Sequence, residues 1–172
     1  CRVRRGAMTR PVVVSDAGPL IALAGCGQLA LLVAVFDAVH VPQMVLDETT
    51  ADRSRPGAND IAAFVHAHAR VHPRRDDAIY AAAIGHLDEG EAQALSLAHA
   101  LGCGVLMDER RGRQTAMRQG LPLFGVLGVL VQAKRIGRIE RVAGALDQMQ
   151  ANGYRISQAL VDAALKLAGE AS

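Results

Sequence analysis

Short apolar runs separate longer stretches in which apolar residues recur every three or four positions. The runs at 11–15, 38–41 and 104–107 are mostly aliphatic, which is typical of strands buried in a parallel sheet. The stretches between them have the helical period, so we expect helices to connect the strands. This alternation predicts an α/β fold, a three-layer α/β/α sandwich with a central, mostly parallel sheet and extra C-terminal helices.

Start and stop residues place the ends of several helices. A proline opens each of the helices expected at 19–23 and 42–50. Asp88 and Glu91 have the spacing of a capping box at the start of a helix over 88–101. The other expected elements are helices at 28–35, 60–70, 109–118, 126–136, 139–151 and 157–168, a loop at 52–59, a short strand and a loop within 71–87, and an edge strand at 121–124.

The N-terminal third of the chain bears on the cellular compartment. Residues 1–10 contain four arginines and no apolar run, so we expect a disordered basic lead-in to a single domain at 11–172. Residues 17–36 carry no charge and are long enough to cross a bilayer. Breaks at 18–19 and 25–28 interrupt this stretch, which favours two short core helices. The sequence therefore predicts a cytoplasmic protein without a membrane segment.

Composition and charge limit the classes of function. The chain has 19 basic and 17 acidic side chains and a net charge of only +2, so any nucleic-acid contact must come from a local patch. Its three cysteines have no short spacing, which argues against a disulfide framework and against a zinc knuckle. The sequence contains neither the nucleophile motif G-x-S-x-G nor the phosphate-binding motif G-x-x-x-x-G-K-[ST].

Two acidic residues stand directly after expected buried strands. Asp16 follows the strand at 11–15, and Asp108 follows the strand at 104–107. Open parallel sheets bind ligands at the carboxyl ends of their strands, so both side chains are candidates for a site. Each also has an ordinary explanation, an Asx-turn for Asp16 and a helix N-cap for Asp108.

Two glutamates join this pair if the fold gathers the neighbouring helix starts. Glu48 lies in the helix after the second strand, and Glu91 lies in the first turn of the helix before Asp108. Taken singly, Glu91 is a capping-box partner, and Glu48 is a solvated helix acid with Asp47 as an equal candidate. Four unpaired carboxylates in one cleft would repel one another and raise their pKa values. A divalent cation, Mg²⁺ or Mn²⁺ given hard oxygen ligands, would remove that conflict and supply water for attack on a phosphodiester.

The segments around the four acids resemble, in order, the motifs of PIN-domain proteins. The second segment selects Glu48 over Asp47, since family members carry a metal-site Glu at that position. Glu91 stands where many members have Asp, and Gly18 stands where many have Ser or Thr. The GEAQAL and DERRGR forms are similar to a bacterial PIN-like subgroup long catalogued as a domain of unknown function. The matching segments are Val14–Ile21, Val41–Glu48, Asp88–Leu95 and Leu106–Arg113.

This resemblance spans about Val12 to Glu170 and implies a metal-dependent ribonuclease that cleaves RNA phosphodiesters with Mg²⁺ or Mn²⁺. Relatives are often toxins of toxin–antitoxin pairs. The implied partners are therefore RNA, a cognate antitoxin protein and a second copy of the chain in a homodimer. The residues implied to be catalytic and to bind the metal are Asp16, Glu48, Glu91 and Asp108, with Glu109 as a fifth candidate ligand.

Three arginines that follow Asp108 are candidate RNA contacts. Arg110, Arg111 and Arg113 could bind backbone phosphates, which would give affinity without sequence information. The alternative is a solvated helix face, and for Arg113 a structural role is favoured.

Two other functions compete with a nuclease. A haloacid-dehalogenase-like phosphatase also uses a strand-end Asp, but it needs a second acid two residues later, where this chain has Gly18. A catalytically weak or inactive PIN-fold module that binds protein or RNA stays open. Metal-dependent RNA cleavage that is lost in Asp16→Asn would separate the nuclease from this module.

Overall fold

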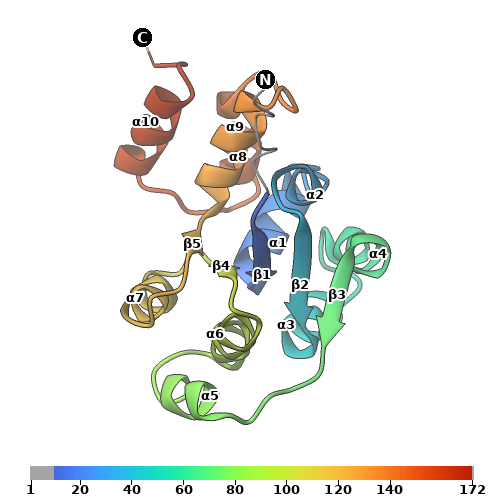
Figure 1. Cartoon of the computed structure of the whole chain (residues 1–172). Helices are drawn as coiled ribbons and strands as arrows, with labels where there is room; N and C mark the ends of the chain where they lie inside the picture. Colours follow the sequence, from blue (N-terminus) through green and yellow to red (C-terminus); the bar gives the residue numbers. More distant parts are fainter. Residues whose placement is uncertain (1–9, 172) are drawn as a thin grey trace, which may run out of the picture.

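The structure, a computed structural model, describes residues 10–171, so the predicted lead-in at 1–10 lies almost wholly outside the described residues. Within this range, five strands form one sheet in the order β3-β2-β1-β4-β5 (Figure 1). All four neighbouring pairs are parallel, which agrees with the predicted sheet. The strands are β1 (Val12–Ser15), β2 (Ala38–Pro42), β3 (Ala69–His72), β4 (Gly104–Leu106) and β5 (Leu123–Phe124).

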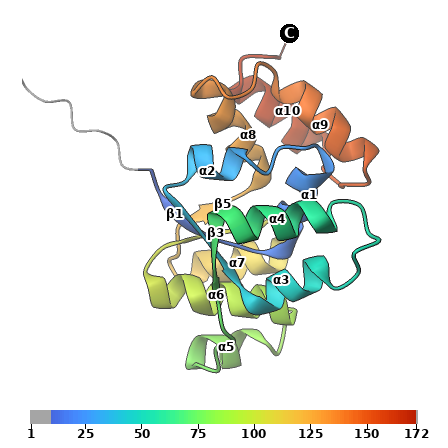
Figure 2. The ribbon, with the colours of Figure 1, turned by 90° about the vertical axis from the view of Figure 1, so that its right-hand side faces the viewer.

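Helices cover both faces of the sheet (Figures 1 and 2). Those at the C-terminus, α8 to α10, stand together at one end of the molecule, as the predicted extra helices should. The helices of the described range are α1 (Ala17–Gly25), α2 (Leu31–Val35), α3 (Gln43–Thr50), α4 (Ala58–His68), α5 (Ala78–Ala83), α6 (Glu89–Leu101), α7 (Arg110–Arg118), α8 (Val126–Arg135), α9 (Val142–Ala151) and α10 (Gln158–Leu167).

Alternation along the strands sends side chains into two hydrophobic cores, one on each face. Val13 and Leu106 belong to the core that α1, α2, α4, α8 and α9 complete. Val14, Val105 and Met107 belong to the opposite core, which α5, α6 and α7 complete. The three-layer α/β/α architecture predicted from the sequence is thus confirmed.

The order of the strands reverses at β1. From β1 the chain builds β2 and β3 on one side and then crosses to β4 and β5 on the other. The N–H of Asp16 donates to the carbonyl of Leu106 at 3.0 Å, which holds the ends of β1 and β4 together. Open sheets bind ligands outside the strand ends at such a switch point. Asp16 directly follows β1, and Asp108 lies two residues beyond β4.

Two local predictions were wrong. Within 71–87 a short strand and a loop were expected; the strand is present as the end of β3, but a helix, α5, follows it. Asp77 caps this helix by accepting from the Tyr80 N–H at 2.9 Å, and its six residues are too few to show a helical period. Ala69 and Arg70, predicted at the end of the preceding helix, instead begin β3, because they pair with β2.

The uncharged stretch at 17–36 forms α1 and α2, the two short helices predicted there. Both pack into the core on one face of the sheet. Among the residues from 10 to 171, no helix is long and apolar enough to span a membrane.

Polar contacts tie the C-terminal helices together. Glu170 accepts hydrogen bonds from the N–H groups of Val142 (2.6 Å) and Ala143 (3.0 Å) and pairs with Lys134 (2.9 Å). Burial raises the pKa of Glu170, but these partners outweigh it and lower that pKa to about 2. These contacts join the segment after α10 to the start of α9. The loop between α9 and α10 reaches the switch point.

Candidate functional site

An acidic cleft of about 470 Å³ opens at the switch point. It lies between the carboxyl ends of β1 and β4, the start of α6, and the loop that joins α9 to α10. Four of the predicted site residues line it together, while Glu48 lies beside it. The carboxylates that line the acidic cleft are Asp16, Asp88, Glu91, Asp108 and Glu109, and its other lining residues include Gly18, Leu127, Tyr154, Arg155 and Leu160.

Like Glu91, which is 5% exposed, Asp16 is buried, with 7% of its surface exposed. It occupies the N-cap position of α1, but its side chain makes no capping hydrogen bond. Burial raises the pKa of Asp16 to about 7, and the charges of Asp88, Glu91 and Glu48 add to the shift. The Ala17 N–H opposes this shift without overcoming it, so burial dominates the electrostatics of the Asp16 carboxylate.

Glu91 combines a structural contact with a place in the acidic cleft. Its N–H donates to Asp88 Oδ1 at 2.8 Å, and its Oε2 accepts from the Asp88 N–H at 3.1 Å, as a capping box requires. Burial raises the pKa of Glu91, and the charges of Asp88 and Glu109 raise it further. The capping box and the cleft are thus compatible, since capping aims the glutamate towards the strand ends.

Glu48 lies on α3 beside the acidic cleft, and its side chain is not part of the cleft wall. Its carboxylate lies over Gly90, where an added Cβ would come within 2.6 Å of Oε2. Burial raises the pKa of Glu48, followed by the charge of Asp88, while the Gly90 N–H opposes the shift. Asp47 instead accepts from Gln43 Nε2 at 2.8 Å. The geometry therefore distinguishes two acids that composition could not.

Asp108 closes the side of the cleft near α8. Its Oδ1 accepts from the Val126 N–H at 3.1 Å, whereas its buried Oδ2 has no hydrogen-bond partner within the described chain. Burial raises the pKa of Asp108, and the nearby Tyr154 hydroxyl, the Val126 N–H and Arg113 oppose that shift. The Tyr154 hydroxyl acts on the same carboxylate, and burial together with the charge of Asp108 raises the pKa of Tyr154.

The arginines after Asp108 separate into two groups. Arg110 and Arg111 are exposed on α7. Arg113 turns inward, and its Nη1 donates to the carbonyls of Met107 (2.8 Å) and Phe124 (3.4 Å). It thereby binds the ends of β4 and β5 to each other, which is the structural role favoured for it. Its predicted contact with RNA is not supported by this geometry and stays untested.

The acids line one cleft without forming a closed ligand shell. Across residues 10–171, no three His, Cys, Asp or Glu side chains come close enough together to hold a metal ion by themselves. Mg²⁺ commonly keeps several waters and binds proteins through only one or two carboxylates, so a closed shell is not required. The lone Oδ2 of Asp108 and the crowded, buried Asp16 provide acceptors that suit a hard cation.

Sequence reasoning missed three residues of the cleft. Asp88 was noticed only as a helix cap, yet its carboxylate also lines the cavity. Tyr154 and Arg155 lie in the loop between α9 and α10, which no motif marks. Their only sequence signal is a tyrosine beside an arginine in a short loop, in a chain with two tyrosines.

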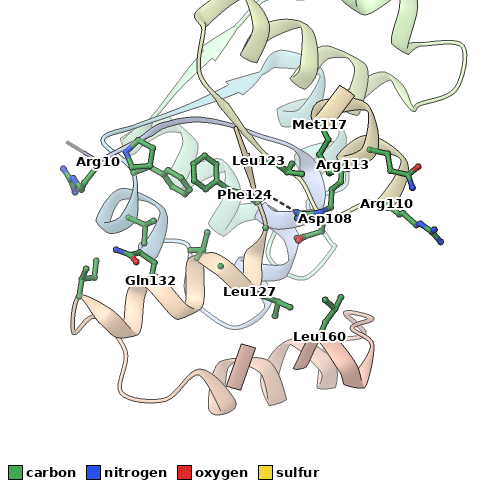
Figure 3. A pocket seen from close by; sticks show the side chains of 18 residues that line it. Arg10, Asp108, Arg110, Arg113, Met117, Leu123, Phe124, Leu127, Gln132 and Leu160 are labelled. Carbon is green, nitrogen blue, oxygen red and sulfur yellow. Dashed lines mark hydrogen bonds between the residues drawn. The ribbon is translucent and has the colours of Figure 1, made fainter. Parts of the chain in front are cut away.

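A larger apolar groove, about 1100 Å³, adjoins the acidic cleft (Figure 3). It lies between the edge strand β5 with α7 on one side and α8 with α10 on the other. The groove and the cleft share Asp108, Leu127 and Leu160. Figure 3 shows Leu123, Phe124, Leu127 and Leu160 around it, with Asp108 and Arg113 at one end.

Comparison with known proteins gives one family and several similar folds. The family model DUF3368, described as a PIN domain, matches residues 12–170. A PilT N-terminus domain protein, SSO1118 from Sulfolobus solfataricus, superposes with a TM-score of 0.53 at 12% identity, covering 71% of this chain and 92% of its own. PAE2754 from Pyrobaculum aerophilum superposes with a TM-score of 0.52 at 19% identity, covering 76% and 94%. No curated protein gives a significant match. At these identities the structural matches bear on the fold alone.

Proposed function

The chain belongs to the PIN-domain family, a nuclease superfamily, and we propose that it is a metal-dependent endoribonuclease whose active site is the acidic cleft. The observation that carries this proposal is the place of Asp16. A buried carboxylate stands at the switch point of the sheet, forms no ion pair within residues 10–171, and has its pKa raised further by three other acids. Such a group costs stability in the folded chain, which is expected of a residue retained for function.

A bound Mg²⁺ or Mn²⁺ would lower the pKa of a coordinated water and neutralise charge that develops on the phosphodiester. The residues that would hold it are Asp16 and Asp108 from the strand ends, with Glu91 and Glu48 from the helices. Asp108 would use Oδ2, since Oδ1 is bound to the Val126 N–H. Glu109, at the mouth of the cleft, is a fifth candidate.

The fold divides the work among these residues. Asp16 and Asp108 are held by strands that pack on both faces, so their carboxylates have fixed positions. Glu91 is oriented by its capping box, and the N-terminus of α6 favours the negative charge gathered there. Arg113 keeps β4 and β5 joined beneath Asp108. Arg110 and Arg111 remain available for phosphates of the RNA backbone.

Cleavage of RNA by purified protein tests the proposal. We expect single-stranded RNA to be cut with Mg²⁺ or Mn²⁺ and to stay intact with excess EDTA. Asp16→Asn should lower the rate more than about a thousandfold, because metal-assisted chemistry is worth several kcal/mol. Asp60→Asn, an exposed acid at the start of α4, is the matched control and should cleave normally.

Failure of this test would favour the other candidate. A chain that binds RNA or protein but cleaves nothing with either metal would be a PIN-fold binding module. Equal cleavage by wild type and Asp16→Asn would place the active site elsewhere.

A toxin role, a cognate antitoxin and a homodimer are further predictions that rest on kinship, and so does a cytoplasmic location. Expression of the chain should arrest growth, and co-expression of the neighbouring gene product should relieve the arrest. Asp16→Asn should be harmless in the same assay. Growth arrest by this variant would separate toxicity from the acidic cleft.

A further inference from the structure

The acidic cleft carries negative charge that repels RNA, and a single bound metal ion does not neutralise all of it. Five carboxylates line it, and the substrate proposed for it is a polyanion. Like charges in a cleft lower the local concentration of an anionic substrate, whereas a positioned cation raises it. Among the described residues that line this cleft, Arg155 is the one with a basic side chain.

Arg155 sits on a loop whose backbone is well anchored. Tyr154 packs against the hydrophobic core, and its N–H donates to the Met149 carbonyl at 3.0 Å. Asn152 Nδ2 donates to the Gly25 carbonyl at 2.6 Å, which ties the loop to α1. The Arg155 side chain is exposed, but the backbone that carries it is fixed at the wall of the cleft.

Several other arginines of the chain are engaged in the fold. Arg10 pairs with an aspartate at the surface, Arg75 pairs with Asp77, and Arg113 binds two carbonyls. For the Arg155 guanidinium, the described chain offers neither an ion pair nor a hydrogen bond. All of its donors are therefore available to a ligand.

We propose that Arg155 binds a non-bridging phosphate oxygen of the RNA strand that enters the acidic cleft. This inference rests on the proposed ribonuclease function. A guanidinium matches a phosphate with two parallel N–H donors, which a lysine cannot reproduce. Tyr154 anchors the loop that carries Arg155, since it packs against the hydrophobic core and its N–H is bound to Met149. Arg155 thus adds substrate affinity at the same cleft where the carboxylates hold the metal.

Binding and cleavage can test this contact separately. In the Asp16→Asn background, Arg155→Ala should weaken binding of a labelled, mixed-sequence single-stranded RNA by about tenfold to a hundredfold. The slope of log affinity against log salt should become shallower by about 0.7, the value for one phosphate contact on a single strand. Arg155→Lys should keep the slope but recover only part of the affinity. In the cleaving wild-type background, Arg155→Ala should raise KM more than it lowers kcat.

Arg138→Ala, an exposed arginine beyond the end of α8, is the matched control and should leave affinity and slope unchanged. The melting temperature of Arg155→Ala should equal that of the parent, because no contact within the fold is lost. An unchanged salt slope in Arg155→Ala, or an equal loss in Arg138→Ala, would overturn the inference. Neither result depends on whether the wild type cleaves RNA, so the inference and the proposed function can fail independently.

Discussion

The acidic cleft and the apolar groove meet at Asp108, yet they are opposite in character. The groove has more than twice the volume, about 1100 Å³ against about 470 Å³, and is lined mostly by aliphatic and aromatic side chains. The cleft gathers five carboxylates at the switch point of the sheet. The larger cavity is therefore not the proposed active site. The proposed site lies where the strand ends and the start of α6 bring carboxylates together.

The side chains of the groove and of the cleft also differ in how they affect the stability of the fold. Side chains of the groove, such as Leu127 and Phe124, gain stability from packing. Asp16 and Glu91 instead hold buried carboxylates whose pKa values are raised, so their ionised forms oppose folding. Changes in the cleft should reduce activity with little loss of stability, whereas changes in the groove should leave activity nearly unaltered.

Among the substitutions that compare the cleft with the groove, that of Glu48 should have the largest effect on the cleavage rate. Glu48→Gln should lower the cleavage rate by about tenfold to a hundredfold, because it removes a carboxylate that acts on the metal site from its edge. Asp47→Asn, the adjacent acid bound to Gln43, should cleave like wild type. If rates measured at saturating Mg²⁺ fall in Asp47→Asn and not in Glu48→Gln, the assignment is reversed.

Gly90 allows the Glu48 carboxylate to be displaced without altering any acid. The added Cβ in Gly90→Ala would lie within 2.6 Å of Glu48 Oε2, so the flexible glutamate must move. We expect cleavage to fall by about tenfold. The free energy of unfolding should change by about 1 kcal/mol or less, because the helix preference of alanine opposes the loss of the contact between the Gly90 N–H and Glu48.

Gly144→Ala, a helical glycine with no atom near its added Cβ, is the control for this pair of measurements. Chemical denaturation and cleavage should both be measured on each variant. Loss of stability in Gly90→Ala together with normal cleavage would show that Glu48 has no part in the site.

The groove gives the smallest expected effect. Met117 lines it with 67% of its surface exposed. Met117→Ser should change the cleavage rate by no more than about twofold, because this exposed side chain does not line the acidic cleft and its loss should hardly affect folding. A tenfold loss of cleavage would mean that substrate passes through the groove and that the two cavities act as one.

The sequence was most informative where backbone position alone decides placement. Asp16 and Asp108 could be predicted at the strand ends because the apolar runs before them are unambiguous and parallel strands end at one edge. The capping box at Asp88 and Glu91 could be predicted from spacing. These features depend on residues close together along the chain.

The rest of the site depends on contacts that no local pattern encodes. Glu48 and Asp47 are adjacent, and only the packing of α3 on α6 separates their roles. Tyr154 and Arg155 reach the cleft because two contacts place their loop there. One joins Glu170 to the start of α9, and the other joins Asn152 to α1. The helix α5 was missed because it is short and because burial against α6, rather than its own periodicity, stabilises it.

The most direct test of the acidic cleft as a metal site is the melting temperature of wild type and Asp16→Asn, with and without Mn²⁺. The pKa of Asp16 is raised from 3.8 to about 7 in the fold, so the folded chain binds more protons than the unfolded chain between these values. Metal-free wild type should therefore lose stability as the pH rises through this window, by an amount on the order of 4 kcal/mol at most.

Above about pH 7, where Asp16 is ionised, Mn²⁺ should raise the melting temperature of wild type. Below about pH 5 the proton competes with the metal, and the increase should disappear. Asp16→Asn should melt higher than metal-free wild type at the upper pH and should not respond to Mn²⁺. Equal responses of the two proteins to Mn²⁺, or no response of wild type at any pH, would contradict a metal site built on Asp16.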